Sequence, residues 1–204
     1  MITFSNVEAT LDSLEQKTPE LFSKCLLIGG WCALLYYREL AKQNDPDFPA
    51  PIPESKDRLQ SNDLDFTNVW KGDFFDALPD FIVHPKVGAP YLEIEGVRIG
   101  FAQAPEAIDP EEAFARCRWF RTKAGTKFAI LDPLRLYRGK QALIQKGRKK
   151  ANDPFHLQIA STYARFERAE AIKKHTSKPT SSSHARVARL TKEMRDIAPE
   201  LLRK

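Results

Sequence analysis

The sequence has few cysteines, few histidines and no long apolar run. Its three cysteines form no C-x-x-C pair and are odd in number, which favours buried reduced thiols over a disulfide framework. The four histidines are scattered along the chain, so a zinc site is not favoured. The longest apolar run, 26–37, is interrupted by two glycines and is shorter than the roughly 20 residues that a membrane helix needs. We therefore expect no transmembrane segment.

The sequence also lacks the composition of disordered and secretory segments. Residues 1–15 show no basic stretch followed by an apolar one, so we expect a cytoplasmic protein. Hydrophobic residues make up 42% of the 204 positions and charged residues 29%, which is close to the globular average. A chain of this length forms one domain of ordinary size, or one domain with a tail.

The net charge of +5 is concentrated at the C-terminal end. Residues 173–204 contain nine Lys or Arg and three Asp or Glu, so they carry +6 while the rest of the chain carries −1. Such a segment can contact a polyanion such as RNA, or it can be a solvated charged surface. Because no aromatic residues lie among these charges, the solvated surface is slightly favoured. We therefore expect a domain over 1–172 and a basic C-terminal tail over 173–204, with RNA as a candidate partner of the tail.

Apolar periodicity predicts a chain of strands and helices, and we expect an α+β protein with a small mixed β-sheet flanked by helices and a helical C-terminal portion. Four prolines between positions 43 and 62 predict a long loop. Three Asp-Pro pairs each predict a helix start, with the aspartate as the cap. A Ser/Thr/Pro linker is expected over 176–183. The predicted strands are 25–28, 63–66, 91–95 and 97–103, and the predicted helices are 5–14, 31–41, 74–81, 133–146, 154 to about 175, and 185–202.

The sharpest chemical feature is the sequence Asp63-Leu64-Asp65. Residues two apart on a strand point to the same face, so both carboxylates face one side while Leu64 anchors the strand in the core. Two like charges this close favour a divalent cation, and hard oxygen ligands suit Mg²⁺. The alternative is a pair of solvated aspartates at a strand end.

A glycine pair lies upstream of these carboxylates. Gly29 and Gly30 join an apolar strand to a helix that is expected to begin near Trp31. Glycines at such a junction let backbone N–H groups approach an anion, and a helix N-terminus favours negative charge, so a triphosphate could dock there. The alternative is a tight turn that packs the helix on the strand.

Together these features resemble the nucleotidyltransferase fold superfamily, in the segments LLIGGWCALLYY and SNDLDF. The segment FAILDPLRLYRGKQALIQKGRKKANDPFHL extends the resemblance to the minimal nucleotidyltransferases and to relatives of abortive-infection toxins. The resemblance covers roughly residues 20–165. It implies a Mg²⁺-dependent transferase that moves a nucleoside monophosphate from an NTP to a hydroxyl of RNA, protein or a small molecule. A toxin-type member is one candidate within this resemblance, with a cognate antitoxin as a candidate partner.

The resemblance assigns roles to individual residues. Asp63 and Asp65 are the expected Mg²⁺ ligands and, with Lys140, the catalytic residues. Lys140 would reach the triphosphate, although a surface lysine on an amphipathic helix is an equal alternative. Asp153 is expected to cap its helix. The residues expected to bind nucleotide are Gly29, Gly30, Trp31, Arg148 and Lys150.

Two departures from the family pattern affect this interpretation. The proline-rich segment 43–62 stands where a short spacer is usual, which suggests an added lid or partner surface. Active members commonly carry a third carboxylate on the strand after the acidic pair, whereas alternation here places Arg98, Gly100 and Ala102 on that face. Glu93 and Glu95 are possible substitutes, but solvent-facing positions are favoured for both.

Two other functions fit parts of the sequence. A catalytically lapsed protein of the same fold would bind a nucleotide or a partner, and the missing third carboxylate favours it. A nucleotide-sugar glycosyltransferase also uses a D-x-D motif, but such enzymes are generally longer than this chain and lack the Gly-Gly helix. Nucleotidyl transfer therefore remains the first hypothesis.

Overall fold

The computed structural model describes residues 3–59, 61, 63–68, 82–83, 90–102, 108–147 and 151–203. The chain forms two compact units, each built from two segments. Unit 1 comprises residues 1–32 and 54–132, and unit 2 comprises residues 33–53 and 133–204. Among the described residues, no helix combines the length and the apolar character needed to cross a bilayer.

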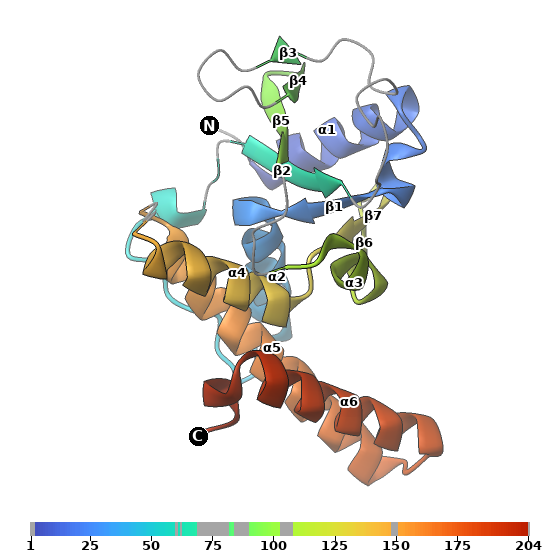
Figure 1. Ribbon diagram of the computed structural model, residues 1–204, viewed down its shortest axis with the longest axis vertical. Helices are drawn as coiled ribbons and strands as arrows, with labels where there is room; N and C mark the ends of the chain where they lie inside the picture. Colours follow the sequence, from blue (N-terminus) through green and yellow to red (C-terminus); the bar gives the residue numbers. More distant parts are fainter. Residues whose placement is uncertain are drawn as a thin grey trace. The chain divides into compact units, whose positions relative to one another are not determined.

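Unit 1 is built on a seven-stranded sheet with the strand order β3-β4-β5-β2-β1-β7-β6 (Figure 1). Pairs β1/β7 and β2/β5 are parallel and the other neighbours are antiparallel, so the predicted mixed sheet is confirmed. The strands are β1 (Cys25–Ile28), β2 (Asp63–Asn68), β3 (Ile82–Val83), β4 (Pro90–Ile94), β5 (Val97–Ala102), β6 (Arg118–Arg121) and β7 (Lys127–Ile130).

The hairpin β4–β5 follows directly from its sequence. Glu95 and Gly96 form a two-residue turn with φ angles of 52° and 74°, the positive values that a type I′ turn requires. On β5, Val97, Ile99 and Phe101 are buried and the residues between them face outward, as their alternation predicts. The strands predicted over 91–95 and 97–103 therefore form an antiparallel hairpin.

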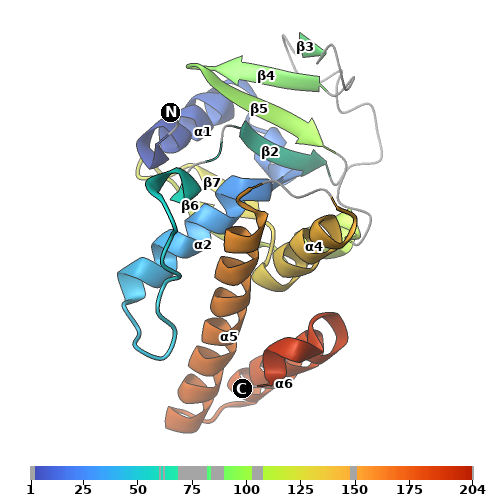
Figure 2. The same ribbon diagram turned by 90° about the vertical axis from the view of Figure 1, so that its left-hand side faces the viewer.

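Helix α1 (Phe4–Lys17) covers one face of this sheet and contacts β4 and β5 (Figure 2). Val7, Leu11 and Leu14 are buried at helical spacing, as expected. Its capping box pairs Thr3 with Asn6 rather than the Ser5 and Glu8 that the S-x-x-E spacing suggests. The helix therefore begins before Ser5, which is inside its first turn.

Unit 2 is helical and confirms the helical C-terminal portion. It contains most of α2 (Gly29–Gln43), α4 (Pro133–Gln145), α5 (Asp153–Ser177), α6 (Ser181–Ile197) and the 3-10 turn η4 (Pro199–Leu202). Helices α5 and α6 lie side by side (Figures 1 and 2), and Leu190 and Met194 of α6 are buried. The predicted linker 176–183 is shorter than expected, because α5 and α6 extend into it from both ends. The predicted start of the tail, residue 173, lies inside α5.

The three Asp-Pro pairs give different helix starts. Asp109 caps α3 (Pro110–Ala115) by accepting a hydrogen bond from the Glu112 N–H, as predicted. Helix α4 begins at Pro133, and Gly147 follows its end with a φ of 76°. The cap prediction for Asp153 is wrong: Asn152 occupies the N-cap position, and Asp153 is the first helical residue.

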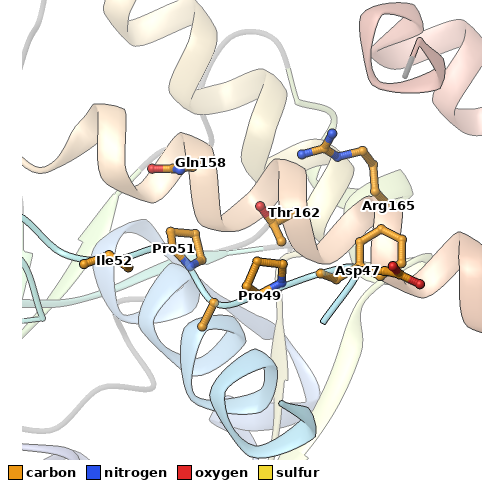
Figure 3. A pocket seen from close by; sticks show the side chains of 9 residues that line it. Asp47, Pro49, Pro51, Ile52, Gln158, Thr162 and Arg165 are labelled. Carbon is orange, nitrogen blue, oxygen red and sulfur yellow. The ribbon is translucent and has the colours of Figure 1, made fainter. Parts of the chain in front are cut away.

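The described part of the proline-rich segment after α2 is irregular except for the turn η2 (Lys56–Leu59) near its end. Another 3-10 turn, η1 (Leu21–Ser23), precedes β1. In unit 2, the first part of the proline-rich segment packs on α5, with the Phe48 ring 5.9 Å from that of Phe166. Residues 47–52 and three α5 residues, Gln158, Thr162 and Arg165, line a hollow of about 480 Å³ (Figure 3). The helix expected over 74–81 lies outside the described residues.

Candidate functional site

Asp63 and Asp65 are the first and third residues of β2, a strand in the interior of the sheet. Leu64 and Phe66 between and after them are fully buried, whereas both aspartates are partly exposed. The alternation therefore places the two carboxylates on one face of the strand, as predicted. The buried neighbours fix their backbone, so the carboxylates are presented from a rigid element.

Gly29 lies directly against the Asp65 carboxylate. Ile28 pairs with Asp65 in the antiparallel β1/β2 register, and α2 begins at the next residue. A Cβ atom at position 29 would lie 2.7 Å from Asp65 Oδ2 and 3.3 Å from Asp65 Cβ. Gly29 also has a φ of 76°, in the left-handed region that favours glycine. Only glycine satisfies both conditions, so the start of α2 and the acidic strand β2 lie in direct contact.

The glycine pair starts the helix earlier than expected. Helix α2 begins at Gly29 rather than near Trp31, so both glycines lie in its first turn. The first backbone N–H groups of an α-helix have no partner within the helix. Gly29 and Gly30 therefore belong to the end of α2 where an anion is favoured.

Trp31 holds this end of α2 against the chain before β2. Its side chain is fully buried, and its indole N–H donates a 3.0 Å hydrogen bond to the Ser61 carbonyl oxygen. Its ring also meets the Phe4 ring edge-on at 5.1 Å. A buried ring is not available to a nucleotide, so the predicted nucleotide binding by Trp31 is limited to its backbone.

Strand β5 supplies the neighbours of the two carboxylates. It runs parallel to β2, with Arg98 opposite Asp63 and Gly100 opposite Asp65. A Cβ atom at Gly100 would lie 3.1 Å from Asp65 Oδ1, so Asp65 is flanked by glycines of two elements. Arg98 Nη1 lies 3.9 Å from Asp63 Oδ1, and its guanidinium also covers the Tyr91 ring at 5.1 Å.

The β2/β5 register confirms that the strand after the acidic pair brings an arginine and a glycine beside it. Glu93, on β4, pairs with Arg98 and is exposed. Among the residues that the structure describes, no group of three or more His, Cys, Asp or Glu side chains could hold a metal ion. The candidate metal ligands among the described residues of this site are therefore Asp63 and Asp65. Alternation in the sequence placed Gly100 on this face, and the register adds that it lies directly opposite Asp65.

Lys140 and Asp153 form a buried ion pair within unit 2. Lys140 Nζ lies 2.6 Å from Asp153 Oδ1, and their side chains are only 9% and 2% exposed. The carboxylate at the start of α5 is thus used to neutralise an ammonium of α4. The contact of Lys140 with a triphosphate stays a prediction. Arg148 and Lys150 lie outside the described residues.

The thiols offer no nucleophile at this site. Cys25 and Cys32 are buried reduced cysteines, and Cys117 is partly exposed. Burial raises the pKa of the Cys25 thiol, and burial followed by the nearby Asp132 carboxylate raises that of Cys117. Raised pKa values keep these thiols protonated and weakly reactive at neutral pH.

The comparisons with known proteins find a distant structural similarity. No protein-family model matches the sequence, and no curated protein matches it. The crystal structure of the Megavirus polyadenylate synthase is similar with a TM-score of 0.37 and 10% sequence identity. The match covers 80% of this chain and 35% of that one.

The carboxylate pair suits a divalent cation. Two carboxylates on one strand face supply the hard oxygen ligands that Mg²⁺ prefers, and Mg²⁺ fills its other positions with water and phosphate oxygens. Glycines at positions 29 and 100 let the Asp65 carboxylate lie closer to both backbones than a Cβ atom would allow. The residues present therefore fit a Mg²⁺ ion that carries phosphates.

Proposed function

We propose that this protein is a Mg²⁺-dependent nucleotidyltransferase whose metal ligands are Asp63 and Asp65. The observation that carries the proposal is the close approach of Gly29 to Asp65, because it joins an anion-favouring helix start to a cation-favouring carboxylate. A triphosphate with its Mg²⁺ ion needs both features side by side. The sequence resemblance to nucleotidyltransferases agrees with this arrangement.

Each residue of the site has a distinct task in this proposal. Asp63 and Asp65 hold the cation, and the N–H groups at the start of α2, from Gly29 onward, bind phosphate oxygens. The Mg²⁺ ion would supply charge neutralisation at the phosphates. The acceptor hydroxyl transfers its proton to solvent water and attacks the α-phosphorus of the NTP. The bond from that phosphorus to the bridging oxygen breaks, and pyrophosphate leaves.

The experiment tests transfer with each of the two carboxylates removed in turn. Purified protein is incubated with Mg²⁺, each α-labelled NTP, total cellular RNA and lysate protein. Asp63→Asn and Asp65→Asn remove one charge each with little change in shape, and both are expected to lose transfer by at least about a hundredfold. Asp57→Asn, an exposed acid of η2 in the same unit, is the matched control and keeps full activity. Transfer that survives in both site variants refutes the proposal.

The second candidate is a nucleotide-binding protein without transfer. Arg98 and Gly100 favour it, because they occupy the β5 positions beside Asp63 and Asp65. Calorimetry separates the two candidates. Mg²⁺-dependent binding of an NTP that is lost in Asp65→Asn, together with no transfer to any acceptor, supports binding alone.

We also propose RNA as an acceptor, with the exposed basic residues of α6 as one candidate contact. Arg189, Lys192 and Arg195 are all exposed on this helix. The toxin-type role and the cognate antitoxin rest on the sequence resemblance. Growth arrest on expression that Asp65→Asn abolishes would support the toxin role, and normal growth with a transfer-active protein would oppose it.

A further inference from the structure

The hairpin formed by β6 and β7 carries a cationic and aromatic surface in unit 1. Residues 116–127 contain five Lys or Arg and no acid, with an exposed tryptophan among them. We call Trp119, Arg121, Lys123 and Lys127 the hairpin patch. Strand β6 ends the strand order of the described sheet, so its outer edge is unpaired there. Figure 1 shows this hairpin beside α3.

The register places the side chains of the hairpin patch together. Arg121 pairs with Lys127 and Trp119 with Ala129, so Trp119, Arg121 and Lys127 share one face of the hairpin. Arg121 Nη1 donates a 3.1 Å hydrogen bond to the Gly125 carbonyl oxygen, which holds its guanidinium at the turn. Lys123 is exposed in that turn.

Two acids of α1 lie on the opposite face. Thr122 and Thr126 continue the ladder by one residue, so alternation turns their side chains away from the patch. Their hydroxyl groups donate hydrogen bonds to Asp12 and Glu15 of α1, at 2.5 Å and 2.7 Å. Both carboxylates of α1 are therefore bound on the face opposite the hairpin patch. They do not neutralise the positive charge of the patch.

Two features of the patch are costly when it carries no ligand. Like charges directly opposite each other on neighbouring strands destabilise a sheet, and Arg121 and Lys127 form such a pair. Trp119 is also 45% exposed, although tryptophan is usually well buried. The Lys127 ammonium lies 4.3 Å from the centre of the Trp119 ring, so a cation covers the ring surface.

We propose that the hairpin patch binds single-stranded RNA. A base stacks on the Trp119 ring in place of the Lys127 ammonium, and that ammonium, Arg121 and Lys123 bind the adjacent phosphates. Stacking on an exposed aromatic ring flanked by cations is the usual way of holding unpaired bases. A base inside a duplex has no free face to offer, so the tryptophan selects single strands. This inference does not depend on nucleotidyl transfer.

Fluorescence anisotropy of a fluorescein-labelled 20-nucleotide uridine RNA tests the proposal without any NTP. Trp119→Ala is expected to weaken binding about ten- to a hundredfold, and Trp119→Tyr, which keeps a stacking ring, much less. Arg121→Gln/Lys127→Gln is expected to lower the slope of log K against log salt concentration by about 1.4. Lys17→Gln/Lys56→Gln removes two exposed charges elsewhere in unit 1 and leaves binding unchanged.

A second readout separates stacking from a structural role of the ring. RNA should quench tryptophan fluorescence in the wild type and lose most of this effect in Trp119→Phe. Equal affinity for a duplex RNA of the same length, or equal binding by Trp119→Ala and wild type, overturns the proposal. So does loss of binding in Arg189→Gln/Lys192→Gln of α6 with the hairpin variants unaffected, because the tail is then the contact. Failure of nucleotidyl transfer changes none of these outcomes.

Discussion

Replacing Gly29 with alanine tests the feature on which the candidate site depends. The substitution adds one methyl group at a backbone φ of 76°, where an alanine is strained by about 1–2 kcal/mol. The same methyl carbon would lie 2.7 Å from Asp65 Oδ2, so the carboxylate must turn away from its position. Forcing a side chain about 30° off its rotamer costs about 0.5–1.5 kcal/mol. We expect the two effects together to lower the free energy of unfolding by about 2–3 kcal/mol.

Gly96→Ala is the matched control for this experiment. Gly96 has a φ of 74° and lies in the same unit, but a Cβ atom there would meet nothing within 4 Å. It therefore shows the backbone strain alone, about 1–2 kcal/mol. Urea or thermal denaturation measures both variants. For a chain of this size, each kcal/mol corresponds to about 2–4 °C in Tm, so the Gly29 variant should melt a few degrees below the Gly96 variant.

A double-mutant cycle then identifies the source of the difference. In an Asp65→Ala background, the carboxylate oxygen that Gly29→Ala displaces is gone, so the cost of Gly29→Ala should approach that of Gly96→Ala. Gly29→Ala alone should also weaken Mg²⁺-dependent NTP binding, because Asp65 is displaced, while Gly96→Ala should not. Equal destabilisation at the two glycines, or an unchanged cost in the Asp65→Ala background, would refute the reasoning.

Two further predictions concern unit 2. Lys140→Ala leaves the buried Asp153 carboxylate without its cation and is expected to destabilise the protein by about 3–5 kcal/mol, whereas Lys140→Met/Asp153→Leu should recover much of this loss in urea denaturation. An intact Tm in Lys140→Ala would show that the pair contributes little and would return Lys140 to its predicted contact with a triphosphate. Burial, and then the hydrogen bond to Glu200, raise the pKa of Tyr137 from 10.0 to about 12. Because the folded state holds this proton more tightly, stability should fall as the pH rises from 10 towards 12, and Tyr137→Phe should remove that part of the pH dependence.

The local parts of the fold were predictable because their causes lie in neighbouring residues. Alternation of Asp63, Leu64 and Asp65 gives a strand with both carboxylates on one face, and the structure has that arrangement. The turn at Glu95 and Gly96 follows from the same kind of short-range pattern, since it needs two residues that accept a positive φ.

The sequence predictions are wrong where residues far apart in the sequence determine the local structure. An Asp-Pro pair predicts a capped helix, but the buried Lys140 ammonium needs an anion, so Asp153 is used there and Asn152 takes the cap position. Strand β6 was not predicted, because Trp119 and Phe120 are adjacent aromatic residues that face opposite sides of the sheet. Its partly exposed sequence lacks the apolar and polar alternation of a half-buried strand.

Arg98 and Gly100 of β5, which lie beside Asp63 and Asp65, affect metal binding and catalysis in different ways. Arg98 could be expected to exclude a cation from Asp63, but the pair is 3.9 Å apart and its side chains are 47% and 36% exposed. Ion pairs this open contribute about 0–1 kcal/mol, so a divalent cation displaces the guanidinium at small cost. The arginine therefore does not oppose the proposed metal site, and it remains close enough to bind a phosphate. Gly100 has no side chain to accept the proton of an attacking hydroxyl. These two β5 residues therefore supply no group for deprotonation of the acceptor, but they do not prevent the binding of Mg²⁺ and nucleotide.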